Sequence, residues 1–303
     1  MMSRTGVQFG GFHRLLAAQS AVAVLTVASR LAPLGRRYAL PHQALRWVDL
    51  GTMLVWPPAS VAVSYELLRW TQRGARTPRP VALLFLAGTY LLAAGYGNHA
   101  VTNYLHGRLR DAAPEPNATK DGGTAPPRAG EADGPGTVLE RVREIVAFHD
   151  ERFSHPIFFA GSACIDVALV LAQAAHPRHG GYATWDRTLL CANAMVIAAG
   201  IWLNAAFTGA QTSMPAMTLV AAAGLGTWAR AARRGETVPV ATYVGLAYAA
   251  GTAGMALAAA LRAAGRRPGA VDEDEDGGAA SNGQDDARHG AGAGAGAAGN
   301  GRT

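Results

Sequence analysis

The chain has 303 residues, of which 50% are hydrophobic and 16% are charged, well below the charged quarter that is usual in soluble domains. Its two cysteines are too few for a disulfide scaffold and lack the spacing of a cysteine-based zinc module. The formal net charge of +6 comes from arginines that flank apolar stretches, so we expect no nucleic-acid partner. These features favour a protein with several membrane spans.

The lengths of the uncharged stretches predict where the spans lie, because a helix needs about 20 apolar residues to cross a hydrocarbon core of about 30 Å. Arg79 and Arg108 enclose 28 residues without Asp, Glu, Lys or Arg, and Arg187 and Arg230 enclose 42, which is too many for one span. The longer stretch should therefore turn back near residues 208–215, where Gly and Pro interrupt it.

We expect an all-α polytopic transmembrane helix bundle of about seven spans, with a range of six to eight. The expected helices lie near residues 12–32, 47–68, 80–106, 153–176, 187–209, 211–230 and 237–261. The first could also be a signal peptide, but no small-x-small cleavage site precedes Arg30, so we expect an uncleaved span.

The remaining segments are predicted from their composition. Residues 1–106 hold the first three spans, 107–137 form a disordered loop, and 138–262 hold an amphipathic lead-in helix and four spans. Residues 263–303 form a disordered acidic tail rich in Gly and Ala. Arginines are divided almost equally between the two ends of the spans, so they choose no orientation. A single lysine beside abundant Arg, Ala and Gly suggests a bacterial genome, and hence the bacterial cytoplasmic membrane.

Polar side chains gather at the end of the third span. An ionisable group within hydrocarbon costs roughly 2.5 kcal/mol or more, so each one needs a partner or a purpose. Steps of four and three residues place His99, Asn103 and His106 on one stripe of this helix.

A second polar stripe enters the fourth span. Asp150, Glu151 and His155 stand at its start, and α-helical spacing places Glu151 and His155 on one face, which continues through Ser162 to Asp166. The third helix ends, and the fourth begins, on the same side of the membrane. The second helix, with Asp49, starts there too. We therefore expect these groups to form one polar pocket at a membrane face.

The pocket could hold a metal ion, because imidazole and carboxylate are ligands that zinc and iron accept. The expected ligands are His99, His106, Glu151 and His155, with Asp150 and Glu151 as catalytic acid or base groups and Asn103, Asp49, Ser162 and Asp166 in support. Such a site would catalyse hydrolysis or oxidation of a lipid-like substrate that arrives from membrane lipid.

Other interpretations of the same residues stay open. A proton-coupled transporter or channel could use them as a relay, and a haem-binding electron carrier could use His99 or His106 with His155 as axial ligands. Simpler structural roles are a pairing of Asp49 with Arg46, and of Asp166 with a backbone group or a serine.

Two short motifs carry a resemblance. Gly97-Asn98-His99-x-x-x-Asn103, followed by Asp150-Glu151-x-x-x-His155 and Gly161, resembles uncharacterised multi-pass membrane proteins of bacteria, which implies the fold but no activity. Seven spans with embedded His, Asp and Ser are also similar to the alkaline ceramidase-like membrane hydrolases, which implies zinc-dependent amide hydrolysis. Those enzymes carry a His-x-x-x-His pair in the last helix, whereas residues 237–261 contain no histidine.

Overall fold

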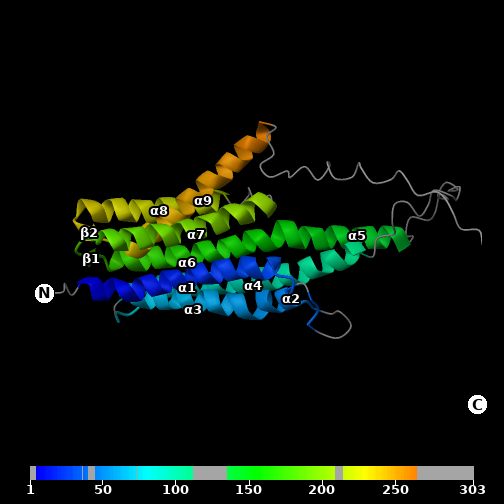
Figure 1. The fold of residues 1–303 in the computed structure, drawn as a ribbon, viewed down its shortest axis with the longest axis horizontal. Helices are drawn as coiled ribbons and strands as arrows, with labels where there is room; N and C mark the ends of the chain where they lie inside the picture. Colours follow the sequence, from blue (N-terminus) through cyan, green and yellow to red (C-terminus); the bar gives the residue numbers. More distant parts are fainter. Residues whose placement is uncertain are drawn as a thin grey trace, which may run out of the picture. The chain divides into compact units, whose positions relative to one another are not determined.

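The computed structural model describes residues 5–35, 37–39, 45–72, 74–111, 135–208 and 214–264. Its contacts divide the chain into one unit of residues 1–260 and another of residues 261–303, and the packing and sites below belong to the first unit. The described part is almost entirely helical (Figure 1), which confirms the all-α fold. The predicted loop at 107–137 and the predicted tail lie largely outside the described residues.

Seven long helices form the bundle: α1 (Thr5–Leu31), α3 (Trp56–Gln72), α4 (Arg79–Asp111), α6 (His155–Ala175), α7 (Thr184–Thr208), α8 (Met214–Arg233) and α9 (Pro239–Ala263). The shorter elements are α2 (Trp47–Leu50), the π-helix η2 (Gly51–Val55), α5 (Pro135–Ala147) and the π-helix η3 (Phe148–Ser154). Strand β1 (Arg178–His179) pairs antiparallel with β2 (Glu236–Thr237), with Arg178 opposite Thr237.

Within the described residues, five helical stretches are long and apolar enough to cross a membrane: Phe9–Leu31, Arg79–His106, Val138–Ala175, Thr184–Leu203 and Pro239–Ala263. They indicate a membrane protein. One expectation changes, because the lead-in helix is not separate: α5, η3 and α6 follow one another without a break from Pro135 to Ala175. The apolar stripe of α5 is also largely outward-facing, since Val138 and Ile145 are exposed and only Val146 is buried.

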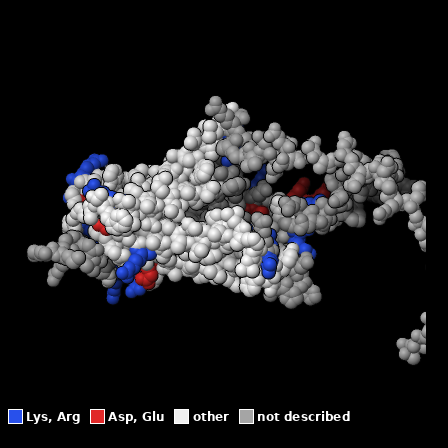
Figure 2. All heavy atoms as spheres, in the orientation of Figure 1, with Lys and Arg blue, Asp and Glu red and all other residues white. Residues whose placement is uncertain are grey.

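The bundle has two ends that matter for the site. At the β end, β1 pairs with β2, α6 and α8 finish, and α7 and α9 begin. At the opposite end, which we call the histidine end, α1 and α4 finish while α2 and α6 begin (Figure 1). On the face seen in Figure 2, charged side chains gather near these ends, and the surface between them is formed by other residues. Tyr90, Leu83 and Leu219 are among the exposed large side chains, as expected for a lipid-facing surface.

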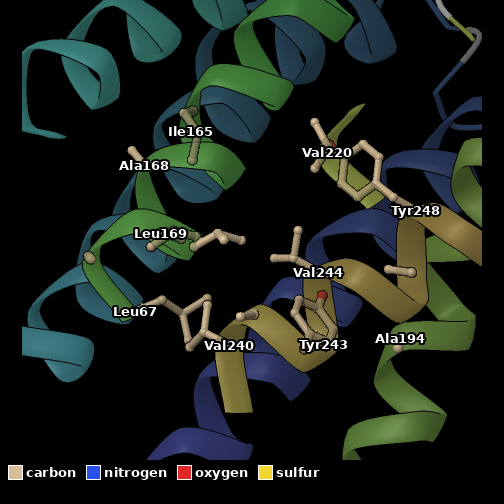
Figure 3. Packing of buried hydrophobic residues seen from close by; sticks show 14 of the residues in the cluster. Leu67, Ile165, Ala168, Leu169, Ala194, Val220, Val240, Tyr243, Val244 and Tyr248 are labelled. Atoms are coloured by element: carbon tan, nitrogen blue, oxygen red, sulfur yellow. The ribbon is translucent and has the colours of Figure 1, made fainter. Parts of the chain in front are cut away.

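Glycines allow the helices to approach closely. A Cβ atom added to Gly161 of α6 would lie 2.3 Å from the backbone nitrogen of Leu92 on α4, and one added to Gly224 of α8 would lie 2.6 Å from the backbone of Gly245 on α9. Small residues at membrane helix interfaces have this effect. The core that results brings Leu67 of α3, Leu169 of α6 and Val244 of α9 together (Figure 3).

Candidate functional site

The close crossing of α4 and α6 places the ends of the two polar stripes side by side. Beyond the glycines, Tyr96 meets Phe158 with ring centres 4.9 Å apart, and His99 meets His155 with ring centres 4.8 Å apart. His99 follows Arg79 by 20 residues, or about 30 Å of helical rise, which is the thickness of a hydrocarbon core. The two histidines therefore belong near one edge of the membrane.

The π-helix η3 determines which side chains face α4. Hydrogen bonds in a π-helix join residues five apart rather than four. Asp150 and His155, five apart, are both buried, with 8% and 7% of their surface exposed. The pairing of Glu151 with His155 was predicted from regular α-helical spacing, which does not apply here. Glu151 lies in η3, but its side chain is outside the described part of the structure.

Asn98 of α4 stabilises this π-helix. Its Nδ2 lies 2.6 Å from Oγ of Ser154 and 3.2 Å from the carbonyl oxygen of His149, and it donates to both. Ser154 in turn donates to the His149 carbonyl at 2.6 Å, across the five-residue spacing. The His149 carbonyl oxygen thus accepts two side-chain hydrogen bonds, one from Asn98 of α4 and one from Ser154 of the π-helix.

Asp150 lies against three side chains of α4. Its Oδ1 is 2.9 Å from Nδ1 of His99, at an angle outside that of a good hydrogen bond, and accepts a hydrogen bond from Thr102 at 3.0 Å. Its Oδ2 is 3.9 Å from Nδ1 of His106, a histidine whose side chain is 45% exposed. Nε2 of His99 is buried and has no hydrogen-bond partner among the described residues. Asp150 therefore lies beside Nδ1 of the His99 ring, while Nε2 faces no protein partner among the described residues.

A polar cavity of about 170 Å³ adjoins His99. The polar residues that line it come from α1, from the start of the second helical run and from α4: Arg30, Arg46, Asp49, Thr52, His99 and Asn103. Arg46 binds the buried Asp49 through two hydrogen bonds of 2.9 Å, which confirms the expected pairing. These hydrogen bonds to Asp49 raise the pKa of the Arg46 guanidinium. The cavity is thus lined by one ion pair, whose two charges cancel, together with the Arg30 guanidinium and the His99 imidazole.

Ser162 and Asp166 lie elsewhere, in a second and deeper cavity of about 200 Å³. Asp166 follows His155 by 11 residues, about 16 Å of helical rise. Its Oδ2 accepts a hydrogen bond of 2.6 Å from the phenol of Tyr248 on α9. The expected backbone or serine partner is therefore wrong, because α9 packs against α6 and supplies a hydroxyl group at this depth.

The described side chains include no group of three or more His, Cys, Asp and Glu residues arranged to hold a metal ion. Of the predicted ligands, His99 and His155 lie with their rings in contact, and His106 lies on the other side of the Asp150 carboxylate, 3.9 Å from Oδ2. Asn103 and Asp49 share the polar cavity with His99. The predicted site residues are therefore divided: His99, Asn103 and Asp49 line the polar cavity, Ser162 and Asp166 line the deeper one, and Asp150 contacts His99 from outside both linings.

Several residues of the two cavities, and of the contacts around His99 and Asp150, were not predicted as site residues. Thr102 and Ser154 follow His99 and Asp150 within one or two turns, so helical spacing could have identified them. Arg30 could have been found from its place at the end of the first span. Tyr248 carries no local signal, because its role depends on contact with a residue 82 positions earlier.

Comparison with family models, curated proteins and solved structures finds no match to this chain. The chemistry of the site must therefore be argued from its residues. An imidazole held by a carboxylate, with its second nitrogen facing no protein partner among the described residues, can accept a proton from water or bind a metal ion.

Proposed function

We propose that this protein is a membrane-embedded hydrolase that acts on a lipid-like substrate and uses His99 as its general base. The observation that carries this proposal is the contact between His99 and Asp150 beside a polar cavity, with Nε2 of His99 buried and unpaired among the described residues. Asp150 orients the ring and stabilises the imidazolium that forms when Nε2 takes a proton from water. The water oxygen then attacks the carbonyl carbon of the ester or amide, and the imidazolium gives its proton to the departing alcohol or amine as the C–O or C–N bond breaks, which leaves a carboxylic acid product.

The arrangement of the two cavities supports a lipid-like substrate. Both are lined by α1 and α4, and their linings are consecutive along α4, with Tyr96 at the deep cavity and His99 at the polar one. Three residues correspond to about 4.5 Å of helical rise. A molecule with a polar group at His99 and an apolar chain in the membrane would place its reactive bond at the edge of the hydrocarbon core.

The proposal includes seven spans rather than five. Residues 47–72 form one helical run of 26 residues, about 39 Å long, and the 20 residues of α8 measure about 30 Å. Both lengths suffice to cross a membrane. With these two helices included, successive long helices run in alternating directions between the β end and the histidine end.

The test of catalysis is hydrolysis of long-chain esters and amides by the purified protein in nanodiscs. Suitable probes are p-nitrophenyl palmitate and N-palmitoylethanolamine, with released palmitate or alcohol measured by mass spectrometry. We expect Asp150→Asn and His99→Gln to lower the rate by about 100-fold or more, because positioned general bases contribute about 100- to 10,000-fold.

A matched control exists at the β end. His13 and Asp186 form a second histidine–carboxylate contact of 2.9 Å, with side chains that are also only 11% and 15% exposed. Asp186→Asn should leave the rate within about twofold of wild type. Equal rates for wild type and His99→Gln on every hydrolysed probe would exclude His99 as the base.

A metal ion is a second way in which the same residues could activate water, and one distance favours it. Two imidazoles on one tetrahedral ion, with bonds of about 2.0 Å, have ring centres about 5 Å apart. The centres of His99 and His155 are 4.8 Å apart. In this case Nε2 of His99 binds zinc or iron, Asp150 is the carboxylate that orients the ligand, and the remaining ligands are to be sought among Glu151, His106 and water.

Elemental analysis of the detergent-purified protein separates the two mechanisms. A bound metal should appear at about one equivalent in wild type and be lost in His155→Ala, and a chelator should abolish hydrolysis. Hydrolysis that survives the chelator in protein without zinc or iron would leave His99 as a general base that acts without a metal.

A further inference from the structure

The deeper cavity has its own polar groups, distinct from the group formed by His99, Thr102, His106, Asp150 and His155, which we call the His99 cluster. It lies between α1, α3, α4, α6, α7 and α9, and its volume of about 200 Å³ is roughly that of seven water molecules in the liquid. Most of its lining is apolar, with Leu92, Phe158 and Ile201 as examples. An apolar cavity with a few convergent polar groups is the usual form of a small-molecule site.

Asp166 is the only described acidic residue in this lining, and it has no opposite charge beside it. Tyr248 donates a hydrogen bond of 2.6 Å to one oxygen of Asp166. Asp166 is partly exposed, and it lines the cavity. The described lining residues include no Lys, Arg or His. A carboxylate in such surroundings is costly unless a cation or several donors approach it.

Two further features favour a positively charged donor. Gln19 also lines this cavity, and its Oε1 is a buried acceptor that lacks a hydrogen-bond partner among the described residues, within a side chain that a bound amine could reorient. Tyr96 and Phe158 bring aromatic rings to the same cavity, and ring faces attract ammonium groups. Carboxylate, amide oxygen and aromatic rings are together complementary to an amine.

We propose that this cavity binds the protonated amine of a lipid-soluble molecule, with the ammonium group at Asp166 and the apolar part along the surrounding side chains. The cavity is partly open, so a chain longer than the cavity can extend out of it. The inference does not depend on hydrolysis at His99, since it concerns equilibrium binding about 16 Å further along α6.

The test is saturable binding of radiolabelled dodecylamine to the full-length protein in phosphatidylcholine nanodiscs, with protein-free nanodiscs as the blank. Unlabelled dodecylamine should displace the label, whereas dodecanol and laurate at equal concentration should not. Asp166→Asn keeps an acceptor for Tyr248 but loses the charge, so its affinity for dodecylamine should fall by roughly 30-fold or more.

Two controls make the result decisive. Asp186→Asn removes a carboxylate at the β end and should bind dodecylamine like wild type, which excludes a general effect of lost negative charge. Tyr248→Phe removes the competing donor and should keep the affinity or raise it. Displacement by dodecanol as effective as that by dodecylamine, or unchanged affinity in a folded Asp166→Asn protein, would overturn the proposal.

Discussion

Two histidine–carboxylate contacts of equal length occur in the first unit, and their surroundings differ. At the β end, His13 meets Asp186 at 2.9 Å, and Asp186 also accepts a hydrogen bond from the backbone of Ala183 at the start of α7. At the histidine end, Asp150 is shared by His99, Thr102 and His106, and the ring of a further histidine packs on His99. The second arrangement concentrates titratable groups around one carboxylate, which is typical of functional sites.

The Arg46 and Asp49 pair gives a prediction at the level of single residues. The Asp49 side chain is only 3% exposed, so Arg46→Ala removes two of the three hydrogen bonds that Arg46 donates to a buried carboxylate and keeps only the one from the backbone N–H. We expect a loss of about 3 kcal/mol in the free energy of unfolding, measured by denaturant titration in detergent.

The double variant separates the ion pair from simple loss of packing. Arg46→Ala with Asp49→Ala removes both charges and should cost less than the sum of the single variants. A double variant whose loss equals that sum would mean that the two side chains do not interact energetically.

At the scale of helices, the contact between α4 and α6 has the tightest backbone approach between two different helices that the described glycines record. A Cβ atom added to Gly161 would lie 2.8 Å from the carbonyl oxygen of Gly88. Any larger side chain at this position must push the two helices apart, and the His99 cluster is built from both of them. The crossing therefore sets the distance between the His99 and His155 side chains as well as the stability of the bundle.

Gly161→Ala should accordingly lower the free energy of unfolding by about 2 kcal/mol, because the added methyl group overpacks the crossing. Thermal unfolding in detergent measures this loss. Gly97→Ala in α4 is the matched control, since nothing lies within 4 Å of its added Cβ, and it should be neutral or stabilising by about 0.5 kcal/mol. Equal melting temperatures for the two variants would contradict the close crossing.

Sequence patterns predicted the long helices well, because the thickness of a membrane fixes how long an apolar stretch must be. They failed where the helix is not regular. A π-helical turn changes which neighbours share a face, and no composition marks it, so the α-helical spacing that placed Glu151 beside His155 does not apply in η3. Asp150, which was also predicted as a site residue, contacts His99. The bond between Asp166 and Tyr248 could not be predicted either, since spacing along one helix says nothing about its neighbour.

For the whole molecule, the seven alternating spans that we propose predict which connections share a side of the membrane. The residues between α3 and α4 and those between α8 and α9 should lie on one side, and those between α1 and α2 on the other. To test this, Arg76, Arg234 and Arg37 are each replaced by cysteine, one at a time, in a protein whose Cys164 and Cys191 are replaced by Ala. Labelling by a membrane-impermeant maleimide then shows which side of the membrane each position faces.

Under seven spans, the cysteines at 76 and 234 react from the same side and the one at 37 reacts from the other. Residues 37 and 76 on one side would mean that α3 does not cross, and residues 76 and 234 on opposite sides would mean that α8 does not. Each helix is thus tested separately.

The unbroken run from α5 through η3 to α6 has a consequence for chain length. The π-helical turn amounts to one surplus residue, and a regular α-helix turns by about 100° per residue. Deleting a single residue between 151 and 154 would therefore restore regular winding and leave the faces of α5 and α6 nearly where they are, because the π-helical turn already absorbs the surplus residue. Asp150 would then precede His155 by four residues, on the same helical face, so we expect a protein shortened by one position here to keep the contact between Asp150 and His99 and all its spans.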